Sequence, residues 1–450
     1  MGIIRKGLPG LLFIFLAALL YVPHKSQSQE PAAQNAALPI PQYRNAAPGV
    51  AYVGSKTCAK CHTDVYESFR KTGMGRSMAL PAERREIRQL TAPVRIKRPD
   101  GNRYYEVYRR GNDVFQSEYE LDAQGRELFR DSQKVSYIIG SGSNGTTPMV
   151  QRGDYMFEAP LSFYTKARVW GLSPGYDKSD YGFSRPIGAD CITCHSSRPR
   201  PVENSDGKFL TPPFEELPLG CENCHGPGSI HVKERLEGAP LEGPVDHSIV
   251  NPEKLPPWLA NNICMRCHQG LDAAVLMPGK AYTDFRPGTP LTNTLAIFAV
   301  PFNRKAPPQE PLLQHFSLMS ISQCYLKSGG KLACISCHEP HVEPSAAGAP
   351  AYFRSRCLRC HTEKSCKLSL AARKAKNPPD NCIGCHMPKQ SLERVSHSSL
   401  TDHRIPARPG EPLPDAAFNL TSPALPDLVH LNAIPAHVAQ VDNAAQAGVP

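Results

Sequence analysis

The chain has no hydrophobic run long enough to cross a membrane as a helix. Its longest apolar stretch, Leu11 to Val22, has twelve residues, whereas a membrane-spanning helix needs about 20. No cysteine follows this stretch closely, which argues against a lipoprotein anchor, and no cleavage site of the Ala-x-Ala kind stands out before Gln29. A cleaved export signal and an uncleaved N-terminal anchor are therefore both open interpretations of the N-terminus.

Long amphipathic patterns are also scarce, and proline is abundant instead. The chain contains 45 prolines among 450 residues, about twice the usual share of roughly 5%. Because proline interrupts helices and central strands, we expect short elements joined by many loops. Such a fold does not depend on long packed helices for its buried surface.

Seven copies of the pattern Cys-x-x-Cys-His use 14 of the 16 cysteines. This is the attachment sequence of c-type haem: two thiols add to the two vinyl groups of one haem, and the next imidazole reaches the iron from one face. Zinc-binding pairs are the alternative, but zinc would not require a histidine directly after every pair. The sequence predicts seven haems, attached at Cys58/Cys61, Cys191/Cys194, Cys221/Cys224, Cys264/Cys267, Cys334/Cys337, Cys357/Cys360 and Cys382/Cys385. The proximal iron ligands that follow are His62, His195, His225, His268, His338, His361 and His386.

The N-terminus supports this chemistry independently. Arg5 and Lys6 precede the apolar stretch and a polar segment follows it, as in an export signal. Haem is attached to c-type cytochromes outside the cytoplasmic membrane, so a protein with these motifs has to be exported. We predict a signal peptide over residues 1–28 and a periplasmic or otherwise exported location, with membrane association through a possible N-terminal anchor.

The formal net charge of +10 does not indicate a nucleic-acid partner. Loss of the signal peptide removes Arg5, Lys6 and Lys25, which leaves about +7, and the propionates of seven ferric haems offset about that amount. The mature oxidised protein is then close to neutral. We expect redox partner proteins, either a quinol-linked donor or a periplasmic cytochrome, and no nucleic acid.

The spacing of the motifs divides the chain. A long interval without haem motifs separates His62 from Cys191, and its residues alternate between apolar and polar among turn signals, which is typical of antiparallel hairpins. The Pro- and Ala-rich C-terminal segment indicates a poorly ordered tail. We expect a flexible lead-in at 29–50, a first haem segment at 51–91, a β-rich insertion at 92–170, a six-haem cytochrome domain at 171–408 and a disordered tail at 409–450.

The predicted fold class is mainly α and irregular: a loop-rich multihaem cytochrome c built around stacked haems, with a small antiparallel β-rich insertion. Within the insertion, strands are expected at Val94 to Lys97, Tyr104 to Tyr108 and Val114 to Leu121. Two roles are open for it: a cover over the haems, or contact with a substrate or partner.

The second axial ligand of each iron separates a carrier from an enzyme. A haem with two strong axial ligands can only pass electrons, whereas an open position can bind and transform a substrate. His341 follows His338 by three residues and His231 follows His225 by six, so each can cap an adjacent haem more easily than its own. The candidate distal ligands are His231, His315, His341, His397 and His403, and weaker candidates are His247, His430 and His437.

Several segments resemble multihaem cytochromes of the cytochrome c-554/c-552 type, a group related to hydroxylamine oxidoreductase, octahaem tetrathionate reductase and pentahaem nitrite reductase. The resemblance covers roughly residues 50–410 and rests on the strings at 221–231, 286–291, 334–341, 385–389 and 401–405. It implies distal roles for His231, His341 and His403.

The chain also departs from this group. Its members commonly carry a histidine about a dozen residues after the first motif, where this chain has Met74. Met74 is therefore the candidate partner of the first haem, with Met78 as a fallback, and methionine ligation would raise the potential of that haem. The lysine-for-histidine motif of pentahaem nitrite reductase is absent, and no match to the cross-linking tyrosine of hydroxylamine oxidoreductase is obvious.

The ligand count leaves two main hypotheses. Met74 and five histidines close six haems, so one haem is open unless His247 closes it. The favoured function is an exported heptahaem electron carrier, and the alternative is a periplasmic reductase or oxidase of a small nitrogen or sulfur compound at one five-coordinate haem. A subunit of an extracellular haem filament is a third class.

Two cysteines, Cys324 and Cys366, lie outside the motifs. These two are the cysteines left over once the haem motifs are counted. Because the chain is expected to be exported to an oxidising compartment, we predict a disulfide between them. Two free thiols are the alternative.

Overall fold

The computed structural model describes residues 42–269, 273–302, 304, 315–389, 401–418 and 428–435. The predicted signal peptide, His397 and His437 lie outside these ranges. Over the ranges that are described, none of the helices combines the length and the apolar character needed to span a membrane.

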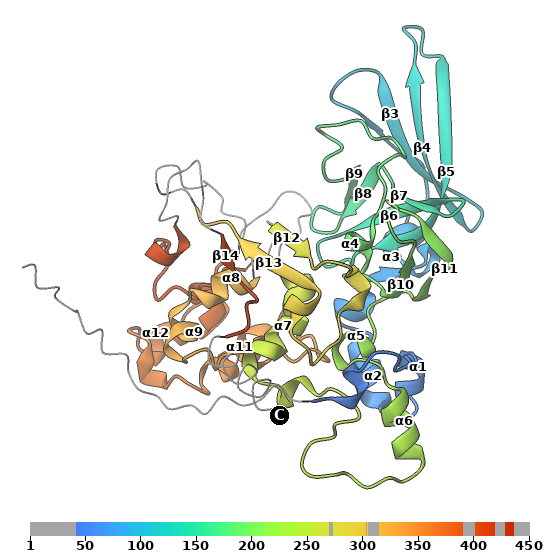
Figure 1. Ribbon diagram of the computed structural model, residues 1–450. Helices are drawn as coiled ribbons and strands as arrows, with labels where there is room; N and C mark the ends of the chain where they lie inside the picture. The colour runs from blue at the N-terminus through green and yellow to red at the C-terminus, as the bar shows by residue number, and fades with distance from the viewer. Residues whose placement is uncertain are drawn as a thin grey trace, which may run out of the picture. The chain divides into compact units, whose positions relative to one another are not determined.

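The largest element is a nine-stranded antiparallel sheet. Seven strands follow the order β2-β3-β4-β5-β6-β8-β9, while β1 pairs with β5 and β7 pairs with β6. Figure 1 shows β3, β4 and β5 as the long arrows of this sheet. The strands are β1 (Met78–Ala79), β2 (Val94–Lys97), β3 (Arg103–Arg110), β4 (Asp113–Leu121), β5 (Glu127–Ile139), β6 (Gly145–Arg152), β7 (Tyr155–Glu158), β8 (Leu161–Tyr164) and β9 (Val169–Leu172).

The hairpin predictions for β2, β3 and β4 are confirmed by the strand pairing. Alternate residues of these strands face a core in which Tyr105 and Val107 are fully buried. On the opposite face, cross-strand neighbours Tyr104 and Tyr119 stack with ring centroids 5.3 Å apart, a pairing that stabilises sheets. The period of two in the sequence is therefore the direct cause of this part of the fold.

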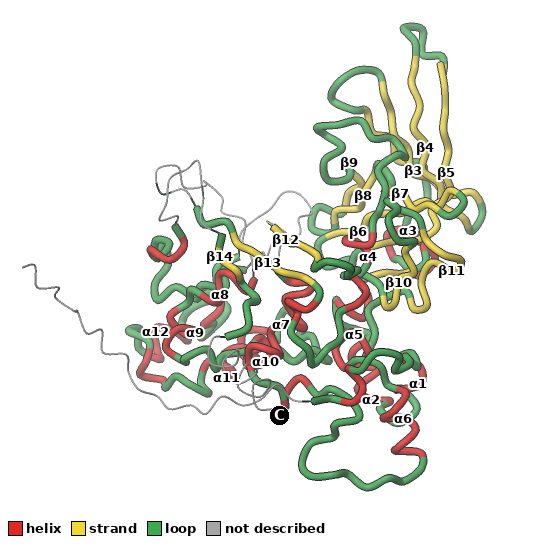
Figure 2. Tube along the Cα trace, viewed as in Figure 1, coloured by secondary structure: helices red, strands yellow, loops and turns green. Residues whose placement is uncertain are grey.

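The prediction of a mainly helical fold with a small β-rich insertion is wrong. Only 28% of the protein is helical, and Figure 2 shows short helices beside a continuous set of strands. The sheet is larger than expected because it extends beyond Leu121 through β5 to β9. The first residues of β5, from Glu127 onward, are exposed on both faces, so the alternation that marks a half-buried strand is missing there.

The helices are short, and most of them carry or adjoin a Cys-x-x-Cys-His motif. The longest, α7, has twelve residues. The helices are α1 (Ser55–Cys58), α2 (Thr63–Phe69), α3 (Arg85–Arg88), α4 (Ala189–Ile192), α5 (Glu222–His225), α6 (Ser229–Leu236), α7 (Pro257–His268), α8 (His315–Ser320), α9 (Gln323–Lys327), α10 (Cys334–Cys337), α11 (Ala349–Cys357), α12 (Leu370–Lys374) and α13 (Cys382–His386).

Two smaller antiparallel sheets complete the fold. β10 (Ser197–Pro201) pairs with β11 (Phe209–Glu216), and β13 (Leu295–Ala299) lies between β12 (Ala273–Leu276) and β14 (Val429–His430). The strand β14 belongs to the segment expected to be a disordered tail. Asn432, just after it, is almost completely buried and exchanges hydrogen bonds with Ile297 and Leu295 of β13, so this part of the tail is held on the fold.

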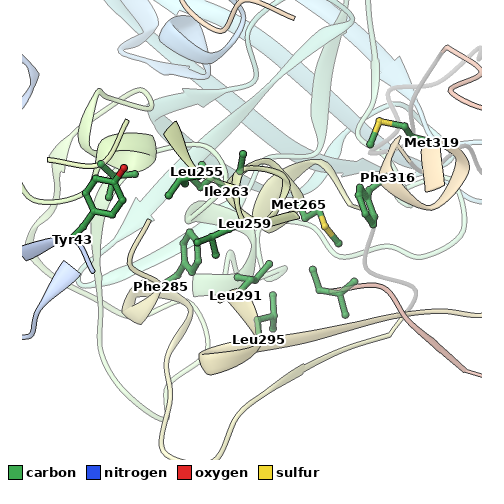
Figure 3. Close-up of a cluster of buried hydrophobic side chains, with 13 residues drawn as sticks. Tyr43, Leu255, Leu259, Ile263, Met265, Phe285, Leu291, Leu295, Phe316 and Met319 are labelled. Atoms are coloured by element: carbon green, nitrogen blue, oxygen red, sulfur yellow. The ribbon is translucent and has the colours of Figure 1, made fainter. Parts of the chain in front are cut away.

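The apolar face of α7 organises the core around the fourth motif. Leu259, Ile263 and Met265 pack against Phe285 and Leu295, as Figure 3 shows. Because α7 ends at His268, this packing fixes the position of the fourth motif. The hydrophobic pattern of one helix thus places a predicted iron ligand.

Candidate haem-binding sites

In the second motif the amide of His195 donates to the Ile192 carbonyl oxygen, three residues earlier, whereas the first, third, fifth and sixth motifs each form one full helical turn. In those four motifs the amide of the histidine donates to the carbonyl oxygen of the first cysteine, four residues earlier. Residues at this spacing lie on the same helix face, so the thiol and the imidazole are directed to one side. The nitrogen-to-oxygen distances are 2.9 Å for Cys58/His62, 3.1 Å for Cys221/His225, 3.0 Å for Cys334/His338 and 3.0 Å for Cys357/His361.

The cysteines of different motifs contact one another. The thiols of Cys58 and Cys221 lie close enough to shift each other's pKa, as do those of Cys194 and Cys267 and those of Cys264 and Cys334. The first motif therefore adjoins the third, the second adjoins the fourth, and the fourth adjoins the fifth. At the other end, α10 contacts α11 and α11 contacts α13, which places the fifth, sixth and seventh motifs in a row.

A compact ion-pair network joins the sixth and seventh motifs. Asp380, two residues before Cys382, accepts from Arg354 at 2.6 Å and lies 3.0 Å from Arg373, and both arginines also bind Glu363. The side chain of Asp380 is only 10% exposed. Separating these groups would leave charges partly buried without partners, which is costly, so the network ties the start of α13 to α11 and α12.

Three motif histidines stack against histidines from distant parts of the chain. Two imidazoles that bind one metal ion from opposite sides, through bonds of about 2 Å each, hold their ring centroids roughly 6 Å apart. The centroids are 6.5 Å apart for His62 and His231, 6.0 Å for His225 and His341, and 6.4 Å for His338 and His403, with interplanar angles of 21°, 11° and 29°. These residues fit a haem iron bound by two histidines.

His315 occupies a different arrangement. Its ring centroid is 5.3 Å from that of His268, at an angle of 72°, and 4.9 Å from that of His403. It therefore lies between the fourth and fifth motifs. This placement joins the two neighbouring sites through a cluster of imidazoles.

Burial favours the neutral form of these imidazoles. It lowers the pKa of His315 to about 3 and that of His338 to about 4, reinforced by neighbouring histidines. It also lowers the pKa of His225, His268 and His403. A neutral imidazole is the form that binds a metal, so the electrostatics suit haem iron.

The second ring nitrogen of several histidines has a partner within the chain. Nδ1 of His225 lies 2.7 Å from the Val250 carbonyl oxygen, and Nδ1 of His386 lies 2.8 Å from that of Pro406. Such a hydrogen bond fixes the tautomer and leaves Nε2 for the metal. The corresponding atom of His403 lies 2.9 Å from the Thr401 carbonyl oxygen.

Two distal histidines have acidic partners instead, which sequence reasoning missed. Nδ1 of His231 lies 3.1 Å from Asp246 Oδ2, and Nδ1 of His341 lies 2.8 Å from Glu339 Oε1. Burial alone would raise the pKa of Asp246, but hydrogen bonds from Ser248 bring it below its ordinary value. A signal existed in both cases, because Asp246 directly precedes the candidate His247 and Glu339 directly follows a proximal histidine.

The remaining candidates are not among the paired histidine rings of the described residues. Met74 is half-buried in a 3-10 helix (Met74–Arg76), and the ring that faces His62 belongs to His231. His247 is exposed, with its Nδ1 3.1 Å from the Gln42 carbonyl oxygen. His430 stacks on Phe298 with ring centroids 4.8 Å apart.

The expected disulfide is not formed. Cys324 and Cys366 are both free thiols. The neighbours of Cys324 are thiols of the fifth and sixth motifs. Burial raises the pKa of Cys324, and the nearby thiol of Cys360 raises it further. Cys324 in turn raises the pKa of Cys337. The helix α9 therefore places Cys324 beside the fifth and sixth motifs.

A cavity of about 390 Å³ opens beside the second, third and fourth motifs. Four guanidinium groups line it, those of Arg198, Arg200, Arg266 and Arg286, together with the carboxylates of Glu222 and of Glu215, which pairs with Arg198. Arginine binds carboxylates in a planar, bidentate geometry. The cavity thus suits the propionate groups that a c-type haem carries.

Comparison with known proteins gives two weak matches, and no protein-family model matches the chain. The chain is 24% identical over 199 residues to the multiheme cytochrome MtrA of Shewanella baltica (strain OS185), which covers 40% of this chain and 54% of the relative. The chain therefore spans about half the length of the curated relative. A solved structure, that of the outer cell wall cytochrome OcwA, aligns with a TM-score of 0.45 and 15% identity over 79% of each chain. Neither match confirms the narrower cytochrome c-554/c-552 type. The similarity to MtrA, added to the Cys-x-x-Cys-His motifs, supports a multihaem c-type cytochrome.

Proposed function

We propose that the chain is an exported heptahaem c-type cytochrome that relays electrons along its row of haem sites. The observation that carries this proposal is the set of three stacked imidazole pairs with centroids 6.0 to 6.5 Å apart. A haem closed on both faces by imidazoles has no position for a substrate, so it serves electron transfer.

The contacts between motifs support an order for the relay. The third motif adjoins the fourth, because Cys224 and the thiols of Cys264 and Cys267 act on one another. The proposed row runs from the first site to the third, fourth, fifth, sixth and seventh, and the second site branches from the fourth. Cysteines of the first, second, sixth and seventh motifs are exposed at Cys61, Cys191, Cys360 and Cys385. We place electron entry and exit at these sites, and passage through the interior at the third, fourth and fifth.

The residues of the chain have separable roles. Bound haem supplies a one-electron ferric/ferrous couple at each site. The cysteine pairs would hold the haems, His62, His225, His268 and His338 would supply one imidazole to each iron, and His231, His341, His315 and His403 would supply the second. The core around α7 holds the fourth motif in place.

The N-terminal segment bears on location and partners. The export signal predicted over residues 1–28 places the mature chain in the periplasm or beyond, because haem attachment takes place there. Its partners are then redox proteins of the cell envelope.

We propose Met74 as no more than a packing residue beside the first site, because His231 already faces His62.

Electron paramagnetic resonance of the oxidised holoprotein tests the proposal. Mass spectrometry of the same sample should give seven covalently bound haems per chain. Low-spin ferric signals at the first, third, fourth and fifth sites, unchanged by nitrite, hydroxylamine or sulfite, are expected. A high-spin signal that shifts when one of these compounds is added would contradict the pure carrier and favour a reductase or oxidase with one open haem.

A further inference from the structure

Positive charge is concentrated around the sixth motif. Residues 354–380 contain eight lysines and arginines and two acidic residues, a net charge of +6 within a chain whose formal net charge is +10. A ferric haem attached at Cys357 and Cys360 adds two propionates and one positive charge at the iron, which leaves about +5. More than half of the formal net charge of the chain therefore lies at one haem site.

The other sites with exposed cysteines do not share this excess, apart from the seventh, which adjoins the sixth through α11 and α13. The segments that form the first site, residues 56–76 and 231–246, together contain seven cations and six acidic residues, a net charge of +1. Residues 180–216, around the second motif, contain four cations and six acidic residues, a net charge of −2. A negatively charged partner is therefore attracted most strongly to the sixth site.

An ion-pair network holds this segment together and leaves most of its cations free. Arg354 of α11 and Arg373 of α12 both bind Glu363, which lies in the 3-10 helix between them, and both also bind Asp380. Five exposed cations of the segment take part in no ion pair with any residue that the structure describes, and we call them the cationic surface: Arg359, Lys364, Lys367, Lys374 and Lys376.

Apolar side chains are exposed among these cations. Leu368 is 48% exposed and Leu370 is 38% exposed, and both lie between Lys367 and Lys374 at the start of α12. The motif residues Cys360 and His361 are exposed as well. Complexes between electron-transfer proteins bury little area and depend on charge for their encounter, so a small apolar patch among cations beside a haem motif suits such a contact.

We infer that the cationic surface is the docking site of a redox protein whose own redox centre is surrounded by acidic side chains. Opposite charge steers the partner to this surface, and the exposed sixth motif is the redox site that it meets there. The inference rests on the proposed function, because it takes a haem bound at Cys357 and Cys360 as a member of the relay.

An acidic flavodoxin is the probe, because its surface is negative and its reduced flavin gives up one electron at a time. In each transfer the flavin hydroquinone becomes the semiquinone and one ferric haem becomes ferrous. Stopped-flow absorbance, with reduced flavodoxin mixed into the oxidised holoprotein, gives the second-order rate constant. Biolayer interferometry with oxidised flavodoxin, which transfers no electron, gives the affinity separately.

The test variant neutralises the four lysines of the cationic surface. At an ionic strength of about 10 mM, its rate constant and its affinity should each fall about tenfold, because electrostatic steering accelerates association by roughly 10- to 1000-fold. At about 0.5 M, salt screens these charges and the variant should match the wild type. Haem content and the visible spectrum should not change. The substitutions are Lys364→Gln, Lys367→Gln, Lys374→Gln and Lys376→Gln.

The matched control removes the same number of exposed cations from strands β2, β3 and β5, which carry no haem motif. Its net charge equals that of the test variant, but the charge near the sixth site is kept. The rate constant of the control should therefore stay within about twofold of the wild-type value. The substitutions are Lys97→Gln, Arg109→Gln, Arg110→Gln and Lys134→Gln.

The outcomes separate docking from the relay. A loss that is confined to the test variant and abolished by salt supports the docking site, whereas no loss, or an equal loss in the control, would overturn it and leave the relay untouched. If the test variant loses binding to phosphatidylglycerol vesicles while its reaction with flavodoxin is unchanged, the surface serves an anionic membrane and the docking proposal is wrong. Excess flavodoxin should reduce every haem through this one site; reduction of a single haem per chain would contradict the relay and leave the docking site in place.

Discussion

Replacing His231 by alanine should open one haem site and leave the others closed. The rings of His62 and His231 are 6.5 Å apart, which matches two imidazoles on one metal at about 2 Å each. His231→Ala removes the imidazole that α6 contributes, so the space on that side of the proposed iron position becomes empty. The space freed is that of one imidazole, enough for a diatomic ligand on the exposed face of the site.

The expected result is quantitative because only one of the seven proposed sites changes. About one-seventh of the haem should convert from low-spin to high-spin ferric signal, and carbon monoxide binding to the reduced protein should rise by one equivalent per chain. The potential of the opened site should also change, because axial ligands set haem potentials. Stopped-flow and titration with carbon monoxide, together with electron paramagnetic resonance, measure these quantities.

His247→Ala is the matched control, since this histidine lies in the loop that follows α6, is exposed and contacts Gln42 and Tyr43. It should leave both spin state and carbon monoxide binding unchanged. If His231→Ala still binds no additional carbon monoxide and keeps every low-spin signal, His231 is not an iron ligand. The pairing of His62 with His231 would then have to be abandoned, and Met74 would again be the candidate.

Three further predictions concern stability. Asp380→Ala should lower the free energy of unfolding of the holoprotein by about 2 kcal/mol, because it leaves Arg354 and Arg373 with only the more exposed Glu363 as acidic partner. Asp415→Ala should cost under about 0.5 kcal/mol because Asp415 is 90% exposed. Burial raises the pKa of Glu158 to about 7, although Arg185 opposes this. As pH rises, the Glu158 carboxyl therefore ionises in the unfolded chain before it ionises in the folded one. The free energy of unfolding should fall as pH rises from about 4.5 to 7, by up to about 3 kcal/mol. Denaturant unfolding at pH 5 and pH 8 checks this, and a wild-type loss no larger than that of Glu158→Gln would contradict it. Asn432→Ala removes two buried hydrogen bonds to β13, so it should cost about 2 kcal/mol and expose the C-terminal segment to limited proteolysis; unchanged protease resistance would show that the strand β14 is held by other contacts.

The sequence was most informative where the chemistry requires fixed spacing. The Cys-x-x-Cys-His pattern identified the candidate haem sites, since two thioether bonds and an axial ligand leave little freedom in the order of residues. The alternation at Val94 to Lys97 and Tyr104 to Tyr108 likewise predicted strands that the pairing confirms. Both signals are local, and local signals are read directly from the order of side chains.

The sequence was misleading about the size of the sheet and about the loop around His247. The sheet was underestimated because β5 begins with residues exposed on both faces, which removes the period of two. The loop contains a functional candidate, but it is Asp246 that faces His231, while His247 faces solvent. Which of two adjacent side chains points inward depends on the turn, and Ser248 fixes that turn.

By itself, the order of residues determined which side chains can hold haem and that antiparallel hairpins lie between the first two motifs. Only the tertiary structure decided which distant histidine faces which motif, which motifs adjoin, and where the carboxylates lie on the distal rings. His231 and His62 are separated by more than a hundred and sixty residues, and no local pattern specifies such a pair. Their meeting is set by the packing of short helices against one another and by the buried hydrogen bonds of the loops between them.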